Sequence, residues 1–163
     1  MADFPSSVDE SWRSAHLGHW LRLALARFDA RVMECMAQHP GVPLGLSNLA
    51  ARGQISAAHI HITRHLPAAG ARLTDLAAAA GMSKQAMGTL VNQCEAWGMV
   101  RREGHGGHGG DGRAKRVVFT ETGLAWLAAY QEAVAQAEVE MRGAVGDAVA
   151  TVLALGLEAY SGA

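Results

Sequence analysis

Apolar residues recur at helical spacing over most of the chain, which predicts a mainly helical protein. On the N-terminal side this spacing predicts one long helix over residues 11–38. Two prolines follow shortly after, and their rings exclude a continuing helix. Two further helical segments are predicted next, a short one over residues 44–52 and a longer one over residues 55–66.

The pattern changes in the second half of the chain. Two further helices are predicted over residues 72–80 and 83–97, with only two residues between them. Runs with strand character over residues 99–103 and 114–120 then flank a stretch too rich in glycine to be regular. The order is therefore a series of helices followed by a single hairpin.

Helical periodicity returns from residue 121 nearly to the end of the chain. Gly143 and Gly146 are the candidate points at which this stretch divides into two helices. Long apolar stripes at both ends of so small a protein cannot all be buried within one copy. We therefore expect the terminal helices to pack across a two-fold axis and form a homodimer.

Composition narrows the class of protein. The chain has 163 residues, 50% of them hydrophobic, and a formal charge of -1, which favours a folded domain over disorder. The longest weakly polar stretch, residues 148–157, is far shorter than the roughly 20 residues of a bilayer crossing, so no membrane span is expected. An acid near the N-terminus, where a secretory leader carries bases, favours a cytoplasmic protein.

The small net charge hides a segregation along the chain. Residues 83–116 hold six Lys and Arg against three Asp and Glu, whereas residues 117–163 hold one against six. A basic island inside a nearly neutral protein is compatible with contact to a polyanion.

The segment from Leu73 to Trp97 carries the signal of a helix-turn-helix. Two helices joined at a steep angle need a small residue where the backbones approach and a residue tolerant of positive φ at the corner. Ala77 and Gly81 supply both, and Ser83 stands where the second helix needs an N-cap.

The second helix of this motif has a polar face opposite its apolar one. Glutamine and asparagine can address adenine in the major groove, threonine a thymine methyl or a phosphate, and lysine a phosphate or guanine. The alternative is an ordinary two-helix corner with a solvated face. The hairpin that follows favours the DNA-binding interpretation. Arg101 and Arg102 on one strand, and three further basic residues on the other, converge on a flexible tip suited to a minor groove. The candidate DNA contacts are Ser83, Lys84, Gln85, Gly88, Thr89, Asn92, Arg101, Asp111, Arg113, Lys115 and Arg116.

The run from Asp111 to Gly123 resembles the wing and following helix start of the MarR-type winged helix-turn-helix regulators, and the helices from Leu73 to Val100 match in order and spacing. The resemblance implies a mainly α fold with a small β-hairpin wing, a homodimer and a recognition helix in each of two successive major grooves. It also implies that Arg113 enters the minor groove and that Asp111 orients it. The implied organisation is a dimerisation arm over residues 1–54, a winged helix-turn-helix DNA-binding domain over residues 55–120 and a second dimerisation arm over residues 121–163.

Two departures from that pattern are visible. The tip of the wing is richer in glycine and holds His105 and His108, which are expected to face solvent. Residues 40–54 look like an addition between the first and second helices.

The DNA binding of MarR-type regulators usually responds to a small molecule, a metal or an oxidant. A cleft between the arms and the DNA-binding domain, walled by aromatic and imidazole side chains, would suit a planar aromatic or phenolic acid. For the tryptophans of this set, the alternative that they are plain dimer core is favoured over a place in the effector cleft. The candidate effector residues are Trp12, His16, Trp20, His59, Ile62 and His65.

Metal and redox sensing have weaker support. His16 with His19, and His61 with His65, can each share a helix face, but a zinc site needs three or four ligands, so no metal and no other cofactor is expected. Cys94 falls on the apolar stripe of its helix. Cys35, near the end of the first predicted helix, has no lysine neighbour and no helix N-terminus to activate it.

An enzyme is not expected. The histidine pair at residues 61 and 65 lacks the glutamate of a metalloprotease helix, and the chain has no phosphate-cradling lysine loop and no serine on a nucleophile elbow. The sequence thus predicts a dimeric regulator released from a pseudo-palindromic DNA operator by a small effector. The alternatives are a metal- or oxidant-responsive regulator of the same fold, and a winged-helix protein-interaction module without DNA binding.

Overall fold

The computed structural model describes residues 10–55, 57–104 and 115–162, and in it seven α-helices accompany a small antiparallel sheet. A 3-10 turn, η1, precedes the first helix. The elements of the described residues are η1 (Ser11–Arg13), α1 (Leu17–Gln38), α2 (Leu44–Ala51), α3 (Ala57–His65), β1 (Ala71–Arg72), α4 (Leu73–Ala79), α5 (Lys84–Ala96), β2 (Val100–Glu103), β3 (Arg116–Phe119), α6 (Glu121–Val145) and α7 (Asp147–Ser161).

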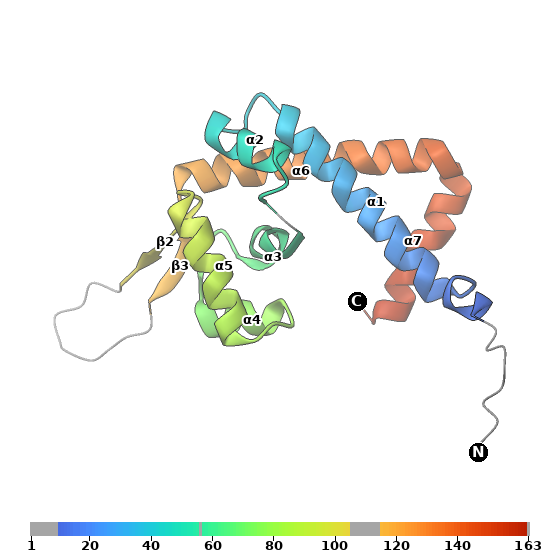
Figure 1. Ribbon diagram of the computed structural model, residues 1–163, viewed down its shortest axis with the longest axis horizontal. Coiled ribbons are helices and arrows are strands. Elements are labelled where there is room, and N and C mark those ends of the chain that lie inside the picture. The colour runs from blue at the N-terminus through green and yellow to red at the C-terminus, as the bar shows by residue number, and fades with distance from the viewer. Residues whose placement is uncertain (1–9, 56, 105–114, 163) are drawn as a thin grey trace, which may run out of the picture.

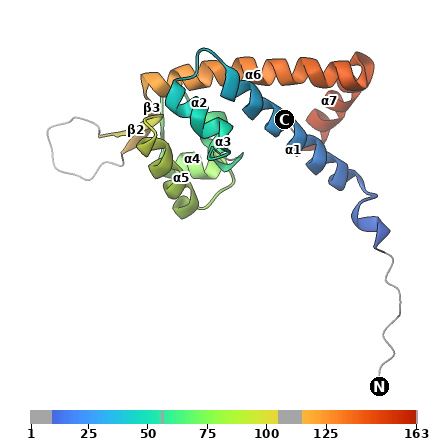
Figure 2. The ribbon, with the colours of Figure 1, turned by 45° about the horizontal axis from the view of Figure 1, so that its top comes forward.

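The helices and the sheet form an arch with two unlike ends (Figures 1 and 2). Helix α6 runs across the top, α1 packs against it and slants away from it, and α7 turns back from α6 through 117°. The turn falls at Gly146, whose φ of 88° lies in a region that favours glycine. We call α1, α6 and α7 the arms, and residues 57–104 with 115–119 the lobe. The lobe is at the other end of the arch.

The predicted single helix over residues 11–38 is wrong at its start. The chain forms η1, leaves helical geometry, and begins α1 only at Leu17. His16 is the reason, because its backbone is extended and its Nδ1 accepts a hydrogen bond from the amide of His19 at 3.2 Å. The imidazole of His16 is thus the N-cap of α1, a role that serine or aspartate fills more often.

The sheet of the lobe has three strands, one more than the two-stranded hairpin that the sequence predicted. Its order is β1-β3-β2, with β3 antiparallel to both neighbours and Arg102 opposite Val117. The two-residue strand β1 starts directly after Gly70, whose φ is 78°. A Cβ at that glycine would lie 2.6 Å from the carbonyl oxygen of Val117, so the close approach of the backbones requires glycine.

The helix-turn-helix forms as its sequence predicts. Ala77 is buried between the helices, and Gly81 turns the corner with a φ of 62°. The Ser83 side chain accepts a hydrogen bond from the amide of Ala86 at 3.1 Å, which caps α5. Met87 and Cys94 then lie in the core on the inner face of α5.

One core joins the lobe to the arms. Trp126 of α6 is fully buried, and its Nε1 donates to the hydroxyl of Thr63 on α3 at 3.2 Å. At the start of α6, a Cβ on Gly123 would lie 1.9 Å from the carbonyl oxygen of Met99, so backbone packs directly on backbone there. The predicted fold class, mainly α with a small β-hairpin wing, is confirmed.

Within the part of the chain that the structure describes, each helix taken singly is too short or too polar for a membrane span. Helices α6 and α7 meet the length and hydropathy requirement only together, as a pair bent by 117°.

Candidate nucleic-acid interface

The outer face of α5 is a row of polar side chains one helical turn apart. Lys84, Gln85, Thr89 and Asn92 are exposed, and Gly88 is half-buried between them. The spacing of three and four residues places them on one side of the helix, opposite the buried Met87. The predicted polar face is therefore present and open to a large ligand.

Two of these residues are constrained by their neighbours. The Thr89 hydroxyl donates to the carbonyl oxygen of Gln85 at 3.2 Å, so its methyl group and oxygen lone pairs are what remain for a partner. A Cβ at Gly88 would lie 3.8 Å from the Leu73 side chain, an ordinary contact, so glycine is not required there for packing.

Arg101 and Arg102 on β2 are less available than the sequence suggests. The Arg101 guanidinium donates to Glu103 at 2.5 and 2.9 Å. The Arg102 guanidinium donates to Glu95, and its Nη2 donates to Asn92 Oδ1 at 2.6 Å. Both arginines thus have a carboxylate partner before any DNA arrives.

Arg116 has a structural partner as well. Its Nη2 donates to the carbonyl oxygens of Ala69 and Gly70, at 2.8 and 2.7 Å, and so holds the turn before β1 against β3. Its side chain is half-buried. The guanidinium therefore makes two hydrogen bonds that stabilise the fold, although its charge stays on the side of the lobe that carries the sheet.

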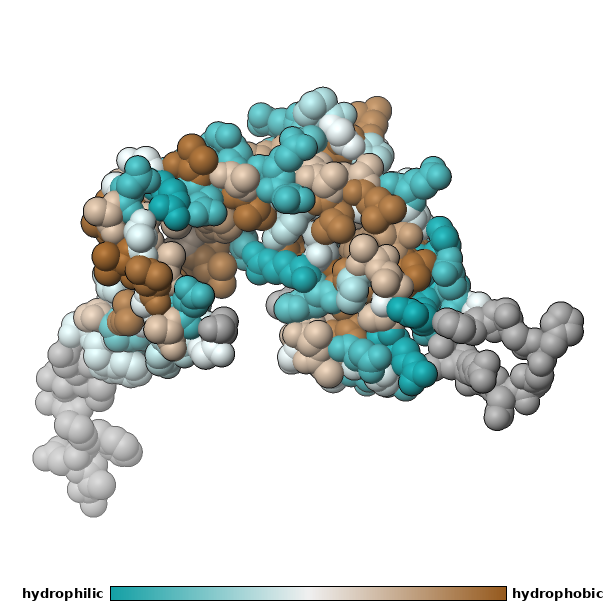
Figure 3. Space-filling view, turned by 180° about the vertical axis from the view of Figure 1, so that it is seen from behind, coloured by the Kyte–Doolittle hydropathy of each residue, from teal (hydrophilic) through white to brown (hydrophobic). Residues whose placement is uncertain are grey.

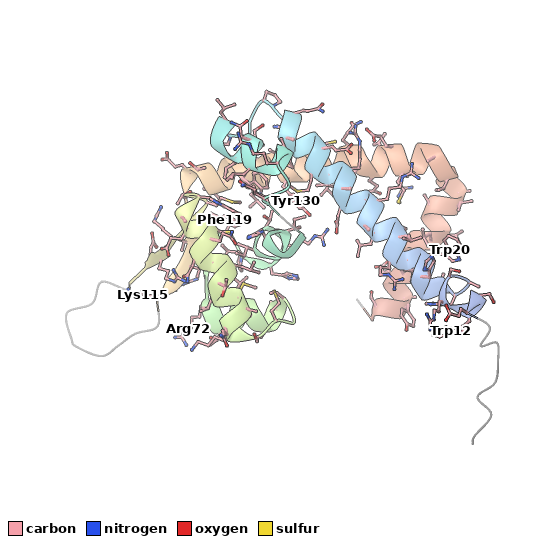
Figure 4. The ribbon with its side chains drawn as sticks, in the orientation of Figure 1. Trp12, Trp20, Arg72, Lys115, Phe119 and Tyr130 are labelled. Carbon is pink, nitrogen blue, oxygen red and sulfur yellow. The ribbon has the colours of Figure 1, made fainter. Side chains whose placement is uncertain are left out.

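Three other cations of the lobe remain open. Among the lysines and arginines described there, Arg72, Lys84 and Lys115 are exposed and have neither an ion pair nor a side-chain hydrogen bond. Figure 4 shows Arg72 and Lys115 at the end of the arch that carries the lobe, far from Trp12 and Trp20. Sequence reasoning missed Arg72, since only the pairing of β1 with β3 brings it beside the hairpin.

The glycine-rich tip of the wing lies outside the described residues. Asp111 and Arg113, the candidate minor-groove pair, and His105 and His108 belong to it. Their predicted roles stay predictions.

The predicted effector residues do not gather within one chain. Trp12, His16 and Trp20 lie around the start of α1, where the rings of Trp12 and His16 stack with centroids 6.3 Å apart. Both tryptophans are more than half exposed. They therefore line no enclosed site in the single copy.

The other predicted effector residues lie on α3 in the lobe. Ile62 is fully buried in the core, so it lines no open surface of the single copy. His59 is buried too. Its Nε2 lies 2.8 Å from Gln93 Oε1, and the centroid of its ring lies 4.8 Å from that of the Trp97 ring. His65 is half-buried on the last turn of α3.

No metal-binding cluster appears in the described part of the chain, and one of its two free thiols, Cys94, is buried. No group of three or more histidine, cysteine or acidic side chains there is placed to hold a metal ion. Burial raises the pKa of the Cys94 thiol to about 12, which keeps it protonated near neutral pH. Cys35 is a half-buried free thiol.

A polar junction ties the lobe to two of the arms, α1 and α6. Arg64 of α3 donates through Nη2 to Asp29 of α1 at 2.7 Å and through Nε to the hydroxyl of Tyr130 on α6 at 3.1 Å. Burial opposes the charge of Arg64, but these partners outweigh it and raise the pKa of the guanidinium. One side chain therefore couples the position of the lobe to both long helices.

Comparison with known proteins places this geometry in a family. The model of the MarR family matches residues 55–113, which include the helix-turn-helix and β2, the first strand of the hairpin. This segment of the chain is therefore similar to the MarR family. The resemblance predicted from the wing sequence is thereby confirmed. No curated protein matches the chain.

Solved structures with the same fold cover nearly the whole chain. The transcriptional repressor CouR bound to a 23-mer DNA duplex has a TM-score of 0.64 at 20% identity, over 96% of this chain and 99% of that one. The MarR family protein RV2887 of Mycobacterium tuberculosis in complex with salicylic acid has a TM-score of 0.60 at 21% identity, over 90% and 96%. BpsR of Bordetella bronchiseptica, whose DNA binding is regulated by 6-hydroxynicotinic acid, has a TM-score of 0.61 at 17% identity, over 92% and 96%. The arms, which the family match does not reach, thus have counterparts in MarR-type structures.

Proposed function

We propose that this protein is a dimeric, sequence-specific DNA-binding transcriptional regulator that a small aromatic acid releases from its operator. The observation that carries the proposal is the open polar face of α5 beside the unpaired cations of the lobe. A capped helix with exposed Lys84, Gln85 and Thr89 fits the major groove. Arg72 and Lys115 supply charge for the phosphates on either side.

The dimer is supported by the arms. Helix α7 exposes apolar side chains around its circumference, and a helix that is apolar all round is normally buried. Trp12, Trp20 and Leu17 add to this surface from the other end of the chain, and we assign the two tryptophans to the dimer interface. Figure 3 shows hydrophobic residues gathered at the arm end of the molecule and the hollow that separates it from the lobe. The exposed large apolar residues of α7 are Val149, Val152, Leu153, Leu155, Leu157 and Tyr160.

A two-fold dimer presents two copies of α5, so the operator is a pseudo-palindrome. Its half-sites lie about one helical turn, or ~10 base pairs, apart. Gln85 reads a base edge, the Thr89 methyl meets a thymine methyl, and Lys84 contacts a phosphate or guanine. Arg113, oriented by Asp111, enters the minor groove as the family resemblance implies.

The effector is a planar aromatic acid. Two of the similar structures concern salicylic acid and 6-hydroxynicotinic acid. The acid acts through the junction of lobe and arms, where Arg64 bridges Asp29 and Tyr130. A ligand that shifts this junction changes the spacing of the two copies of α5 and weakens operator binding.

Salt titrations test the DNA part. An operator is first selected from a random duplex library and then compared with a scrambled duplex. Arg113→Ala is expected to weaken binding to both duplexes and to lower the salt slope by about 1, since it removes one phosphate-neutralising charge. Gln85→Ala is expected to cost about 1–3 kcal/mol on the operator and little on the scrambled duplex.

The control is Arg52→Ala, an exposed cation at the end of α2 outside the lobe, which is expected to leave both affinities unchanged. Equal losses on both duplexes for Gln85→Ala would contradict the reading role. A dimer that ignores duplex DNA even at low salt would support the protein-interaction alternative instead.

The effector part is tested by adding salicylic acid to the protein–operator complex at constant pH and ionic strength. Release of the DNA is expected, with benzyl alcohol as a control that lacks the carboxylate. If salicylic acid, p-aminosalicylic acid and 6-hydroxynicotinic acid all leave the complex intact, this class of effector is wrong.

A further inference from the structure

A polar network on the C-terminal half of α5 fixes the orientation of one proposed DNA-reading residue. The Glu95 carboxylate accepts from the backbone amide of Arg102 at 3.1 Å and from its guanidinium. This fixes the arginine across the gap between β2 and α5, with its side chain one quarter exposed. Its Nη2 then donates to Asn92 Oδ1 at 2.6 Å.

The chemistry of the pair determines which way round the amide of Asn92 lies. A guanidinium has only donors, so the group of Asn92 that faces Arg102 is its carbonyl oxygen. The amide NH2 group is then the end left for another partner. Because Asn92 is exposed on the same face as Gln85 and Thr89, that partner comes from the DNA side of α5.

This orientation works against the usual pairing of asparagine with adenine. That pairing needs the amide oxygen to accept from the adenine amino group while the NH2 group donates to N7. The Asn92 oxygen has a second lone pair, but an amino group that reached it would lie against the guanidinium of Arg102, whose charge and N–H groups repel a donor. The same contact polarises the amide and strengthens its NH2 group as a donor.

We infer that Arg102, positioned by Glu95, makes Asn92 a donor-only reader, which selects guanine or thymine, whose major-groove acceptors have no amino group beside them on the same base, and disfavours adenine, whose N7 acceptor lies next to its amino donor. The inference deepens the proposed function and rests on it. Arg102 is in this view a positioning residue that controls specificity without touching a base. Asn92 is the reading residue, and the acceptor is the O6 or N7 of guanine or the O4 of thymine.

The test is selection of binding sites from a random duplex library by the full-length protein and two variants. Asn92→Asp keeps an oxygen for Arg102 and removes the donor, so the preference for guanine or thymine at one base pair of each half-site is expected to be lost. Affinity for the wild-type operator is expected to fall about tenfold or more. Arg102→Met releases the amide, and the preference at the same base pair is expected to move toward adenine by about tenfold.

Arg101→Met is the matched control. It removes the same charge from the neighbouring position of β2, but its partner is Glu103 and it does not touch α5. It is expected to weaken all sequences alike. Thermal unfolding of each variant shows whether Arg102→Met is folded, and Asn92→Asp tests the donor without disturbing the strand.

The outcomes separate this inference from the proposed function. If the wild-type protein selects a site and Arg102→Met changes preferences no more than Arg101→Met, the positioning role is wrong. Selection of adenine by the wild type at the base pair that Asn92→Asp relaxes, or an equal loss on all sequences for Asn92→Asp, also overturns donor-only base reading. A wild-type protein that selects no duplex overturns the proposed function, and this inference with it.

Discussion

The lobe and the arms place their apolar residues in opposite ways. In the lobe, Met87, Val91 and Cys94 of α5 are fully buried, and the outward positions of the same helix are polar. In the arms, Val152 and Tyr160 of α7 are 71% and 90% exposed, and only Ala150 of that helix is buried. The apolar face of α5 is closed within the shared core, whereas the apolar outer face of α7 stays uncovered, and so large an exposed apolar area is a feature of interaction sites. The proposed DNA recognition and the proposed dimer contact therefore fall at different ends of the arch.

The largest expected effect is at the joint between these two regions. A Cβ at Gly123 would lie 1.9 Å from Met99 O and 2.9 Å from the Phe119 ring, so neither the backbone nor the packed ring can yield cheaply. Gly123→Ala is expected to lower the free energy of unfolding by about 3 kcal/mol through overpacking. Urea unfolding followed by circular dichroism measures it. Gly88→Ala is the control, since its new methyl group meets Leu73 at 3.8 Å and is tolerated.

Breaking the arm surface should separate assembly from folding. Val152→Glu introduces a charge on the exposed face of α7 and is expected to weaken the proposed dimer roughly a hundredfold, because the carboxylate would be buried without a partner. Light scattering over a dilution series measures the mass. Leu44→Glu, an equally exposed position on α2, should leave the mass unchanged. A monomeric wild-type protein would show that the arms serve another purpose.

The junction between lobe and arms is expected to have an intermediate effect. Arg64→Met keeps an unbranched apolar stem and removes the hydrogen bonds to Asp29 and Tyr130, which should cost about 2 kcal/mol of stability. A double-mutant cycle with Asp29→Asn isolates the ion pair. Additive effects in the cycle would show that the two side chains do not couple.

The smallest effect is a pH dependence within the arms. Arg31 of α1 binds Glu140 of α6 through two hydrogen bonds of 2.6 and 2.8 Å, and these bonds lower the pKa of that carboxyl from its ordinary value near 4.5 to about 2. The stabilisation is complete above pH 4.5 and is lost as the pH falls toward 2, since the unfolded chain takes up the proton first. Unfolding at pH 7 and pH 3 should therefore show a smaller loss for Glu140→Gln than for the wild type. Equal losses would mean that the bridge contributes nothing to folding.

The local sequence predicted most of the elements, because their signals act over a few residues. Gly81 at the corner and Ser83 as the cap depend on neighbouring backbone groups alone, and both are found where they were predicted. The helix start at Leu17 was missed, since apolar spacing continues through the point where His16 caps the helix. The division of the C-terminal helices at Gly146 was narrowed to two glycines, and the backbone conformation decided between them.

The candidate interface was predicted in residue type but not in availability. The sequence placed Arg101, Arg102 and Arg116 on a hairpin, yet which cation stays free depends on partners up to 47 residues away. Likewise Ile62 has the spacing of a helix face, and only the packing of α3 on its neighbours determines that the face is buried. Strand β1 and the open position of Arg72 arise from pairing with β3, a contact across the lobe.

By itself, then, the amino-acid order determined the helices, the turn, the cap and the hairpin, because each arises from interactions within one or two turns of chain. Only the tertiary structure decided which charges are paired, which way round the amide of Asn92 lies and which apolar faces remain uncovered. Those properties depend on groups that are distant in sequence and meet only when the core closes.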